Sequence, residues 1–455
     1  MGKGRRLISI IFVVLLTALV LAPFSDGERT FEDYGELEPV TIYLATDTHF
    51  ISPSLTDGGT YYSNMIRNGD GKFMPYCSEI NEAMIEKVIA DRPAAFIVSG
   101  DLTFNGARES HQEYAALLGR VEEAGIPVLV IPGNHDLTLK RAAKFSGDSY
   151  ELVSSIDASE YLDLYVKYGR EDSYDFDETS LSYVYELAPN LRVLCVDVNT
   201  VAGMSGILTP GTLEFVEEQL KKAAEDHAYV ISVTHQTLLV HSELTSQGMS
   251  FINSDKLIEL YEKYNVVLNL SGHMHIQHIV VSGGGVPDIA TGALLTSPNY
   301  YGELKISGKK FDYRAVPLEV PAVPDFAEKS HQFLWENAYR QGMEQLVEAG
   351  AGAAAESASD VNLPDDAAGE LADPATSSAA AGGDTATGAG SAGELAGFFA
   401  DFNVAYIAGR SDLIPWDDAI LKKWEQTESF VPRYFQLVQE EGAQDYTVYE
   451  IDLRE

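Results

Sequence analysis

The stretch Val128-Leu-Val-Ile-Pro-Gly-Asn-His-Asp136 decides the fold of this chain of 455 residues. Four apolar residues of strand length run directly into residues that can turn the backbone, ligate a metal and move a proton. Gly133 permits a sharp turn and Asn134 offers a neutral amide oxygen. His135 can act as an acid near neutral pH, and Asp136 can orient that imidazole. Taken alone, the loop could equally be an ordinary polar turn, so its meaning depends on how the other strands end.

Other apolar runs along the chain end in the same manner. These runs are Val40–Ala45, Ala94–Val98, Leu191–Val196, Tyr229–Val233 and Val266–Leu270. All but the run that ends at Val196 are followed by His or Asp residues suited to metal binding. Helices expected over about 78–90 and 110–124 connect the first three strands, which predicts a parallel core with right-handed crossovers. The loops at the strand ends should therefore meet at one edge of the sheet.

Five segments supply candidate metal ligands at these strand ends. They are Asp47-x-His49, Gly100-Asp101, Gly133-Asn-His-Asp136, His235 and Gly272-His-x-His275. Two carboxylates, one amide oxygen and four histidines, with one histidine to spare, suit a pair of first-row transition ions better than Mg or Ca. Side chains two residues apart, such as Asp47 and His49, can face the same way and hold one ion. A carboxylate between the two halves can bridge.

In order and chemistry these five motifs resemble the calcineurin-like metallophosphoesterases, over roughly residues 40 to 320. The resemblance implies an α/β fold, a four-layer α/β/β/α sandwich of two mixed sheets. It implies that one metal is held by Asp47, His49, Asp101 and His275. It implies that a second metal is held by Asp101, Asn134, His235 and His273, with Asp101 as the bridge. By the same resemblance His135 stays off the metals and faces the substrate, with Asp136 behind it.

His49 and the run Gly100-Asp-Leu-Thr-Phe-Asn-Gly106 are most similar to the branch that contains the class III cyclic-nucleotide phosphodiesterases. An extra loop rich in Gly and Tyr, residues 51 to about 77, lengthens the usual spacing after His49 and could shape substrate access. The resemblance implies hydrolysis of a small phosphoester, with diesters favoured over monoesters. A hydroxide bridging two Mn, Fe or Zn ions would attack, with His135 as acid. A non-catalytic scaffold and a hydrolase of non-phosphate esters are the alternatives, although no ligand is missing.

The charge of the chain limits its partners. A net charge of -38 argues against nucleic acid, because phosphate backbones are bound by clustered Lys and Arg. Two divalent ions would leave the pocket locally positive after the ligand charges are counted, so a phosphate could still bind there.

Residues 1–27 resemble a targeting segment. Lys3, Arg5 and Arg6 precede an apolar run from Leu7 to Ala22, which suits a signal peptide and is short for a bilayer span. This pattern predicts export, with the protein extracellular or at the cell surface. Because no cleavage site is clear, an uncleaved N-terminal segment that tethers the protein to a membrane stays an alternative.

We expect a metallophosphoesterase domain over residues 39–320 and a C-terminal helical region over 321–455. Within that region an Ala/Gly-rich tract at about 349–396 has no Lys or Arg and few large apolar residues. Such a composition predicts a disordered insert between helices. The helices themselves are interpreted as a pack against the catalytic domain or as a partial lid over the substrate.

Several other residues carry smaller expectations. Cys77 and Cys195 are expected not to pair, because Cys195 lies in an apolar run. Helical surroundings predict that His111 and His227 lie on the surface. His241 and His278 follow ligand loops closely enough to reach the pocket, although a structural role is the alternative. Asp197 and Asn199 also end a strand, and a structural turn is expected there.

Overall fold

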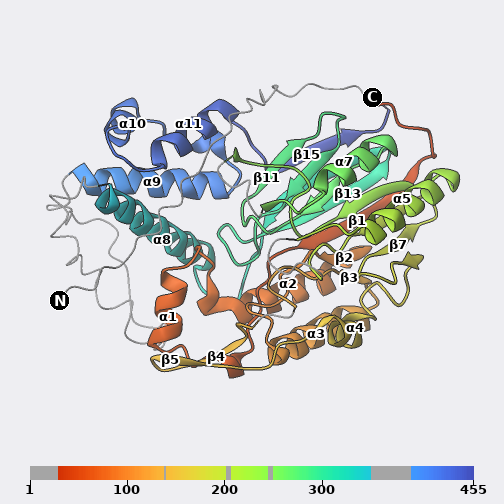
Figure 1. Ribbon diagram of the computed structural model, residues 1–455, viewed down its shortest axis with the longest axis horizontal. Coiled ribbons are helices and arrows are strands. Elements are labelled where there is room, and N and C mark those ends of the chain that lie inside the picture. Colours follow the sequence, from red (N-terminus) through yellow and green to blue (C-terminus); the bar gives the residue numbers. More distant parts are fainter. Residues whose placement is uncertain (1–28, 138–139, 201–205, 244–248, 350–390, 455) are drawn as a thin grey trace, which may run out of the picture.

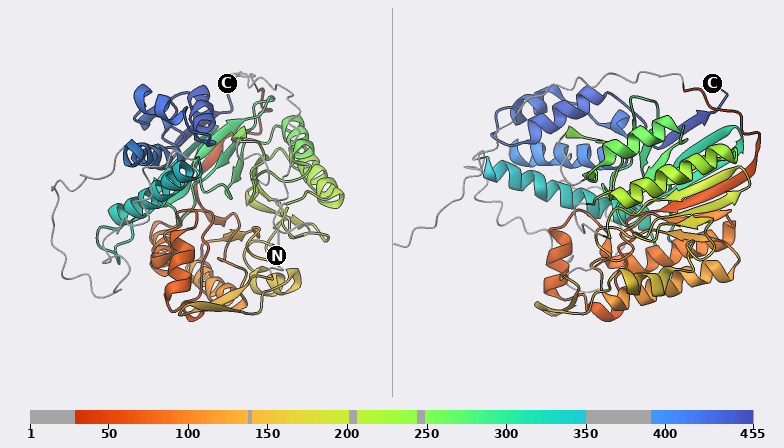
Figure 2. Two further views of the ribbon diagram at one scale, coloured as in Figure 1. Left: turned by 60° about the vertical axis from the view of Figure 1, so that its left-hand side comes forward. Right: turned by 45° about the vertical axis from the view of Figure 1, so that its right-hand side comes forward.

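The computed structural model describes residues 29–137, 140–200, 206–243, 249–349 and 391–454. Two large sheets lie face to face with helices on their outer faces (Figures 1 and 2). In spatial order the first sheet contains β15 (Val448–Asp452), β14 (Lys310–Pro317), β13 (Tyr300–Gly308), β1 (Leu37–Ala45), β2 (Ala95–Val98) and β3 (Val128–Val130). The second contains β11 (His278–Val281), β12 (Pro287–Ala290), β10 (Asn269–Ser271), β9 (Tyr229–Val233), β8 (Leu191–Cys195), β7 (Tyr183–Ala188) and β6 (Asp175–Phe176). The predicted sandwich of two mixed sheets is confirmed.

Parallel pairing at the centre of each sheet sets the position of the loops. β1, β2 and β3 are parallel to one another, and so are β8, β9, β10 and β12. The outer strands β13 and β14, like β6, β7 and β11, pair antiparallel with their neighbours. Because parallel strands end at the same edge, the loops after β1, β2 and β3 come together, as predicted from the alternation of strands and helices.

The strand pleat distributes apolar side chains between the layers. Ile42 and Ile97 face the second sheet and pack with Ile231 there. On the other face of the first sheet, Phe96 packs against helices α2 (Cys77–Asp91) and α3 (Arg108–Glu123). Helices α5 (Pro210–Glu225) and α7 (Ser254–Lys263) cover the outer face of the second sheet. Successive residues of a strand point to opposite faces, so both faces are apolar and both sheets are buried.

The extra loop of residues 51–77 contains more structure than the sequence suggested. Helix α1 (Thr60–Arg67) lies between two single 3₁₀ turns, Pro53–Leu55 and Met74–Tyr76. It buries Tyr62 and Ile66, one helical turn apart, and Tyr62 packs on Phe145 in the hairpin of β4 (Ala143–Ser146) and β5 (Ser149–Leu152). Helix α4 (Ala158–Tyr165) follows that hairpin. The loop is therefore an ordered wall beside the sheet edge.

The C-terminal region packs around its own apolar cluster. Its helices are α8 (Phe326–Glu348), α9 (Ser391–Ile407), α10 (Asp418–Trp424) and α11 (Val431–Glu441). Trp424 and Phe435 are buried at the centre of that cluster. The chain then returns to the first sheet, because β15 pairs with β14. Of the predicted insert at 349–396, residues 350–390 lie outside the described residues, and α9 already begins at Ser391. The proposed domain boundaries stay predictions.

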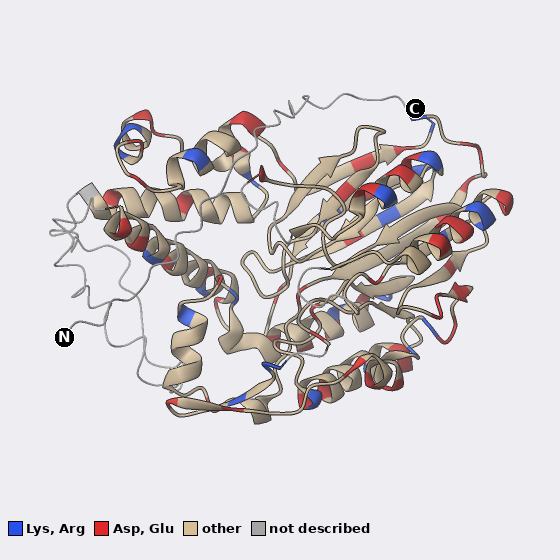
Figure 3. Cartoon of the chain, in the orientation of Figure 1, with Lys and Arg blue, Asp and Glu red and all other residues tan. Residues whose placement is uncertain are grey.

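The predicted targeting segment, residues 1–27, lies outside the described residues. Within the ranges that are described, no helix combines the length and the apolar character needed to cross a membrane. Cys77 and Cys195 are both buried free thiols, so the expectation that they do not pair is confirmed. Acidic residues are spread over the helices of both outer layers (Figure 3).

Candidate metal centre

All seven predicted metal ligands come together where the central strands of the two sheets end. The loops after β1, β2 and β3 supply Asp47, His49, Asp101 and Asn134. The loops after β9 and β10 supply His235, His273 and His275. Ligand atoms of Asp47, His49 and His275 lie within 4.8 Å of one another, and so do those of Asp101, His235 and His273.

In the first cluster, three side chains converge on one point. Nε2 of His275 lies 3.2 Å from Oδ1 of Asp47 and 3.2 Å from Nε2 of His49. Asp47 Oδ1 is buried, and no described residue donates a hydrogen bond to it. Asp47 is held instead through Oδ2, which accepts from Thr46 Oγ1 and from the backbone N–H of His273. A buried oxygen facing two imidazole nitrogens is the arrangement that a bound cation satisfies.

The second cluster shares Asp101 with the first. Nε2 of His235 lies 3.3 Å from Asp101 Oδ1 and 3.0 Å from Asn134 Oδ1. The other carboxylate oxygen, Asp101 Oδ2, lies 3.6 Å from Nε2 of His49. Nδ1 of His235 donates to the Ser99 carbonyl at 2.9 Å, which turns Nε2 toward the cluster. Asp101 thus presents one oxygen to each cluster, as a bridging ligand does.

The backbone at the ligands is in an unusual conformation. Five of the seven ligands have positive φ, namely Asp47 (52°), His49 (37°), Asp101 (48°), His273 (67°) and His275 (58°). The left-handed region costs a residue with a Cβ on the order of 1–3 kcal/mol and is concentrated at functional sites. The sequence pattern gave no signal for this conformation.

His135 lies beside the clusters and reaches outward. Its side chain is 22% exposed, and Nε2 lies 3.9 Å from Asp101 Oδ2, farther than the predicted ligands His49 and His235. Nδ1 donates to the Phe104 carbonyl at 2.8 Å, so that Nε2 is the nitrogen available for chemistry. Ligand atoms of His135, His49 and Asp101 also lie within 4.8 Å of one another, so the expectation that His135 stays off the metals and faces a substrate stays a prediction.

The expectation that Asp136 orients this imidazole is wrong. The Asp136 carboxylate accepts hydrogen bonds from the backbone N–H groups of Leu102, Thr103 and Gly133 and from the Thr103 hydroxyl. It therefore ties the loop after β2 to the loop after β3. The Phe104 carbonyl holds the ring instead, because the side chain of Asp136 turns back into its own loop.

Two charged residues beside the first cluster were missed. Asp70 Oδ2 lies 3.3 Å from Nδ1 of His275, and Nζ of Lys72 lies 2.5 Å from the same oxygen. Both residues belong to the extra loop, in the sequence Gly69-Asp-Gly-Lys72. They follow no apolar run, so the strand-end pattern could not find them; the only signal was the unusual length of the loop.

His111 was also misjudged, because it is fully buried and not at the surface. Its Nε2 donates to the Asp136 carbonyl at 2.9 Å, and its Nδ1 lies 3.0 Å from the Tyr165 hydroxyl. His111 thus supports the loop after β3 from behind. His227 is exposed, as expected.

The remaining candidates have structural surroundings. Nδ1 atoms of His241 and His278 lie 3.1 Å apart, and His241 Nε2 lies 3.1 Å from Asp288 Oδ2. His278 begins β11, and its Nε2 lies 3.5 Å from Oε2 of Glu441 at the end of α11, so both buried histidines have partners of their own. Asp197 accepts from the backbone N–H groups of Asn199 and Leu181, which is the structural turn that was expected.

The electrostatics of the clusters are dominated by their two carboxylates. Burial lowers the pKa of His235, but Asp101 outweighs it and raises that pKa to about 9. Burial and Lys72 likewise lower the pKa of His275, yet Asp47 raises it to about 9. At His49, burial and Lys72 hold the pKa well below its usual value. The carboxylates thus bind positive charge strongly, so these side chains fit two metal ions.

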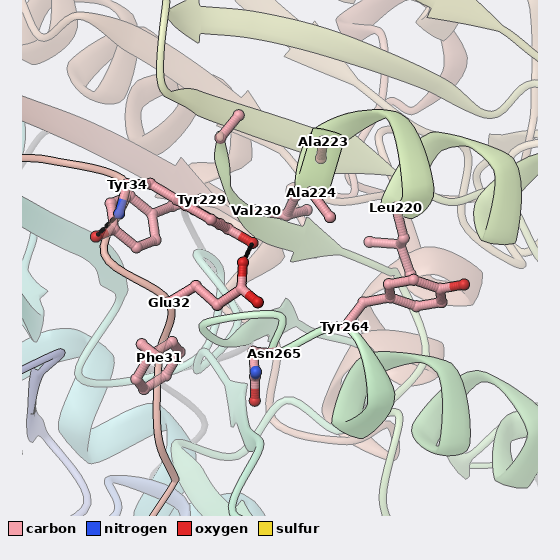
Figure 4. Close-up of a pocket in the computed structure, with 11 residues that line it drawn as sticks. Phe31, Glu32, Tyr34, Leu220, Ala223, Ala224, Tyr229, Val230, Tyr264 and Asn265 are labelled. Carbon is pink, nitrogen blue, oxygen red and sulfur yellow. Dashed lines mark hydrogen bonds between the residues drawn. The ribbon is translucent and has the colours of Figure 1, made fainter. Parts of the chain in front are cut away.

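A small hollow lies at the opposite ends of the strands and is lined mainly by apolar and aromatic residues. Phe31, Tyr34, Leu220 and Tyr229 are among its lining residues (Figure 4). Tyr229 begins β9, whereas His235 follows the end of that strand. Since no histidine lines this hollow, we assign the chemistry to the clustered loops.

Comparison with known proteins agrees with this geometry. Residues 40–277, more than half of the chain, match the calcineurin-like phosphoesterase family. A probable glycerophosphodiester phosphodiesterase, GpdQ, of Arcobacter nitrofigilis is 28% identical over 187 residues, which are 40% of this chain. The match spans 57% of the length of that relative.

Two solved phosphatase structures also resemble the chain at low sequence identity. A dimetal phosphatase from Danio rerio has a TM-score of 0.45 at 12% identity, covering 61% of this chain and 96% of that one. The purple acid phosphatase PPD1 of yellow lupin (Lupinus luteus) has a TM-score of 0.41 at 14% identity, covering 62% of this chain and 52% of that one. Because the family match covers the residues that form both clusters, the chain belongs to the calcineurin-like phosphoesterase family.

Proposed function

We propose that this protein is an exported phosphodiesterase with two transition-metal ions, one in each cluster. The observation that carries the proposal is the position of Asp101 between the two clusters. Its Oδ2 lies 3.6 Å from Nε2 of His49, and its Oδ1 lies 3.3 Å from Nε2 of His235. Bound ions would supply positive charge for the phosphate and lower the pKa of water near neutral pH. The abundance of imidazole ligands favours Mn, Fe or Zn over Mg or Ca.

His135 is proposed as the acid that protonates the leaving oxygen. Burial lowers the pKa of His135, and Arg141 and Lys72 add to this, whereas Asp101 opposes it. The free ring is therefore neutral at neutral pH. A phosphate anion bound beside Nε2 would raise the pKa and favour the protonated ring, while the Phe104 carbonyl keeps the other ring proton in place.

The finer assignments rest on sequence. The preference for diesters is supported by the resemblance of residues 100–106 to cyclic-nucleotide phosphodiesterases and by the relative named as a glycerophosphodiester phosphodiesterase. Export is supported by residues 1–27, with a membrane tether through an uncleaved segment as the alternative.

Metal analysis joined to kinetics tests the proposal. We expect the full-length chain to bind about two transition ions and to lose activity to a chelator, because the ligands are divided around one bridging carboxylate. Asp101→Ala should lose metal and activity together, since it removes a ligand from each cluster. Asp255→Ala, an exposed carboxylate in α7, is the control and should change neither.

The substrate class is tested with bis(4-nitrophenyl) phosphate and 4-nitrophenyl phosphate, each with Mn, Fe, Zn or Mg. A higher kcat/KM on the diester is expected. An active enzyme with one ion or none would contradict the dinuclear site, and a higher kcat/KM on the monoester would contradict the diester preference. Two bound ions without hydrolysis of either ester would favour the scaffold alternative.

A further inference from the structure

Lys72 is a buried cation beside the metal centre of a strongly acidic protein. It is 8% exposed, and its Nζ lies 2.5 Å from Asp70 Oδ2. The same oxygen lies 3.3 Å from Nδ1 of His275, so one carboxylate separates the ammonium from a predicted metal ligand. The contacts from Lys72 to Asp70 and from Asp70 to His275 therefore place the ammonium beside the first cluster.

The turn that carries Lys72 is fixed by helix α8. Asn337 Nδ2 donates to the carbonyls of Arg67 at 2.9 Å and Gly69 at 3.0 Å. Gly71 has a φ of 84° and packs so closely on Leu334 that an added Cβ would lie 2.5 Å from its Cδ1. After the turn, the backbone N–H of Phe73 donates to the Leu295 carbonyl. The lysine is thus held in place by contacts with two distant parts of the chain.

Stability alone does not account for this lysine. Burying an ammonium is unfavourable, and its partner Asp70 has a side chain that is 51% exposed. Ion pairs with such an exposed member contribute little to the stability of a protein. An ammonium has three donors, and Asp70 occupies one side of it. Among the described residues no second acceptor contacts this ammonium, so its other two donors can bind a further anion.

We propose that Lys72 binds a non-bridging oxygen of the substrate's phosphoryl group. The inference rests on the proposed function and adds a third positive group to the two metal ions. A lysine acts on phosphate as a point charge, and charge at such a group stabilises the negative charge that the oxygens carry during transfer. Asp70 holds the ammonium and the ring of His275 in one arrangement, so it is a positioning residue.

Binding of inorganic phosphate to the metal-loaded full-length protein, measured by calorimetry, tests the role of Lys72. Lys72→Gln should weaken phosphate binding by roughly 10- to 100-fold, the worth of one hydrogen bond to a charged group. Its metal content should stay unchanged. Lys72→Arg should retain most of the affinity. The control Lys87→Gln removes a remote pair on α2, Lys87 with Asp91 at 2.7 Å, and should bind phosphate like the wild type.

Each other outcome overturns the inference. Unchanged phosphate affinity in Lys72→Gln with both metals retained would show that the ammonium does not touch the anion. Loss of metal in Lys72→Gln, with rescue in Lys72→Arg, would show that it acts only through Asp70 and His275. If the wild-type protein binds metals but no phosphate, the proposed contact between Lys72 and the phosphoryl group is also excluded.

The proposed function can fail separately, because phosphate binding requires no turnover. If the wild type binds phosphate but hydrolyses neither ester, the proposed function is wrong, and the comparison with Lys72→Gln still decides the role of the lysine. If the wild type hydrolyses diesters and Lys72→Gln binds phosphate normally, only the lysine assignment is wrong.

Discussion

His135 is the residue at which the catalytic and the merely metal-binding interpretations separate. Its Nδ1 proton is fixed on the Phe104 carbonyl, and its Nε2 lies 3.9 Å from Asp101. His135→Ala should therefore keep both metals and lower turnover by on the order of 10²- to 10⁴-fold, the usual worth of general acid catalysis. Metal analysis and kcat, measured on the same preparation, check this prediction.

The leaving group distinguishes an acid from a phosphate-binding ring. An aryl ester with a good leaving group hardly needs protonation, so His135→Ala should slow it less than an alkyl ester. Equal losses on both esters would assign His135 to phosphate positioning. Loss of metal in this variant would show that His135 is a ligand.

His111 predicts how stability depends on pH. Burial lowers its pKa to about 4, although the hydrogen bond to the Asp136 carbonyl opposes this. In the unfolded chain the pKa returns to about 6.5. As the pH falls from about 6.5 to 4, only the unfolded state takes up the proton, so the free energy of unfolding falls with it. The contribution of His111 to the free energy of unfolding is fully present above about pH 6.5 and reaches about 3 kcal/mol at most.

Urea unfolding of the wild type and of His111→Gln between pH 7 and pH 4 checks this contribution. The glutamine can donate to the same carbonyl but cannot titrate, so its stability should fall less steeply over this range. Because the other histidines are common to both proteins, the difference between the two curves isolates His111. Parallel curves would contradict the assignment.

The sequence was sufficient to bring the candidate ligands together and insufficient for the residues that support them. Each candidate ligand directly follows an apolar run or lies within a few residues of one, so the strand pattern predicts that they meet at one edge, whereas the metal that each would hold came from the resemblance to the family. The role of His111 depends on Asp136 and Tyr165, 25 and 54 residues away along the chain. Asp136 itself was placed correctly, but the direction of its side chain depends on the loop after β2.

At the scale of a single loop, Gly133 shows how closely the ligand segments pack. A Cβ added there would lie 2.1 Å from the backbone nitrogen of Asp101 and 2.2 Å from its Oδ1. Gly133→Ala should therefore displace Asp101 and lose both metals and the activity. Gly283→Ala is the matched control, because no heavy atom lies within 4 Å of its added Cβ. Full metal content in Gly133→Ala would contradict this account.

Helix α8 was interpreted as packing or as part of the substrate wall, and Asn337 can distinguish these roles. Asn337→Ala leaves the carbonyls of Arg67 and Gly69 without its two hydrogen bonds, which loosens the turn that carries Lys72. At temperatures well below the melting temperature of the variant, we expect its phosphate affinity to be lower than that of the wild type. The loss should be smaller than in Lys72→Gln. Gln332→Ala, an exposed change on the same helix, is the control. An unchanged affinity in Asn337→Ala would favour simple packing.

Elements with a clear period were predicted, and those that depend on distant partners were not. Helices α2 and α3 lie close to the expected ranges 78–90 and 110–124. Helix α1 was missed because glycines on both sides made the segment resemble a loop, although Tyr62 and Ile66 are one turn apart. β15 was missed because its five residues become a strand by pairing with β14, over 100 residues earlier.

In the whole molecule, the C-terminal region is joined to the catalytic sheets at both of its ends, besides contacts such as the hydrogen bond from the Gln277 N–H to the Ile407 carbonyl. Phe326, at the start of α8, packs into the core between the first sheet and α2, where it contacts Phe73. At the other end, β15 covers the edge of β14. Between these two attachments the helices form their own cluster around Trp424. Two separated attachments make it unfavourable for the region to detach as a unit.

Two deletions should therefore differ in their effect on stability: one within the C-terminal region should change it little, and removal of the whole region should lower it. Replacing residues 353–388 with a short Gly/Ser linker should leave the melting temperature and kcat/KM nearly unchanged. The segment has few large apolar residues to bury, and halving a loop changes its closure free energy by only about 0.6 kcal/mol. Helices α8 and α9 stay together without it, because Gly342 packs directly against Ala396 and Phe399.

Ending the chain after residue 322 removes the C-terminal helices and β15. This truncation should lower both stability and phosphate binding. It exposes the edge of β14, removes Phe326 from the core and releases the turn that carries Lys72. A lower melting temperature, aggregation and weaker phosphate binding should follow, because an unpaired strand edge and uncovered apolar side chains favour association. Thermal melts, light scattering and phosphate titration of both deletions test this contrast. A large loss on shortening residues 353–388 would mean that the segment packs or binds, and an unaffected truncation would mean that the C-terminal region contributes nothing to the metal centre.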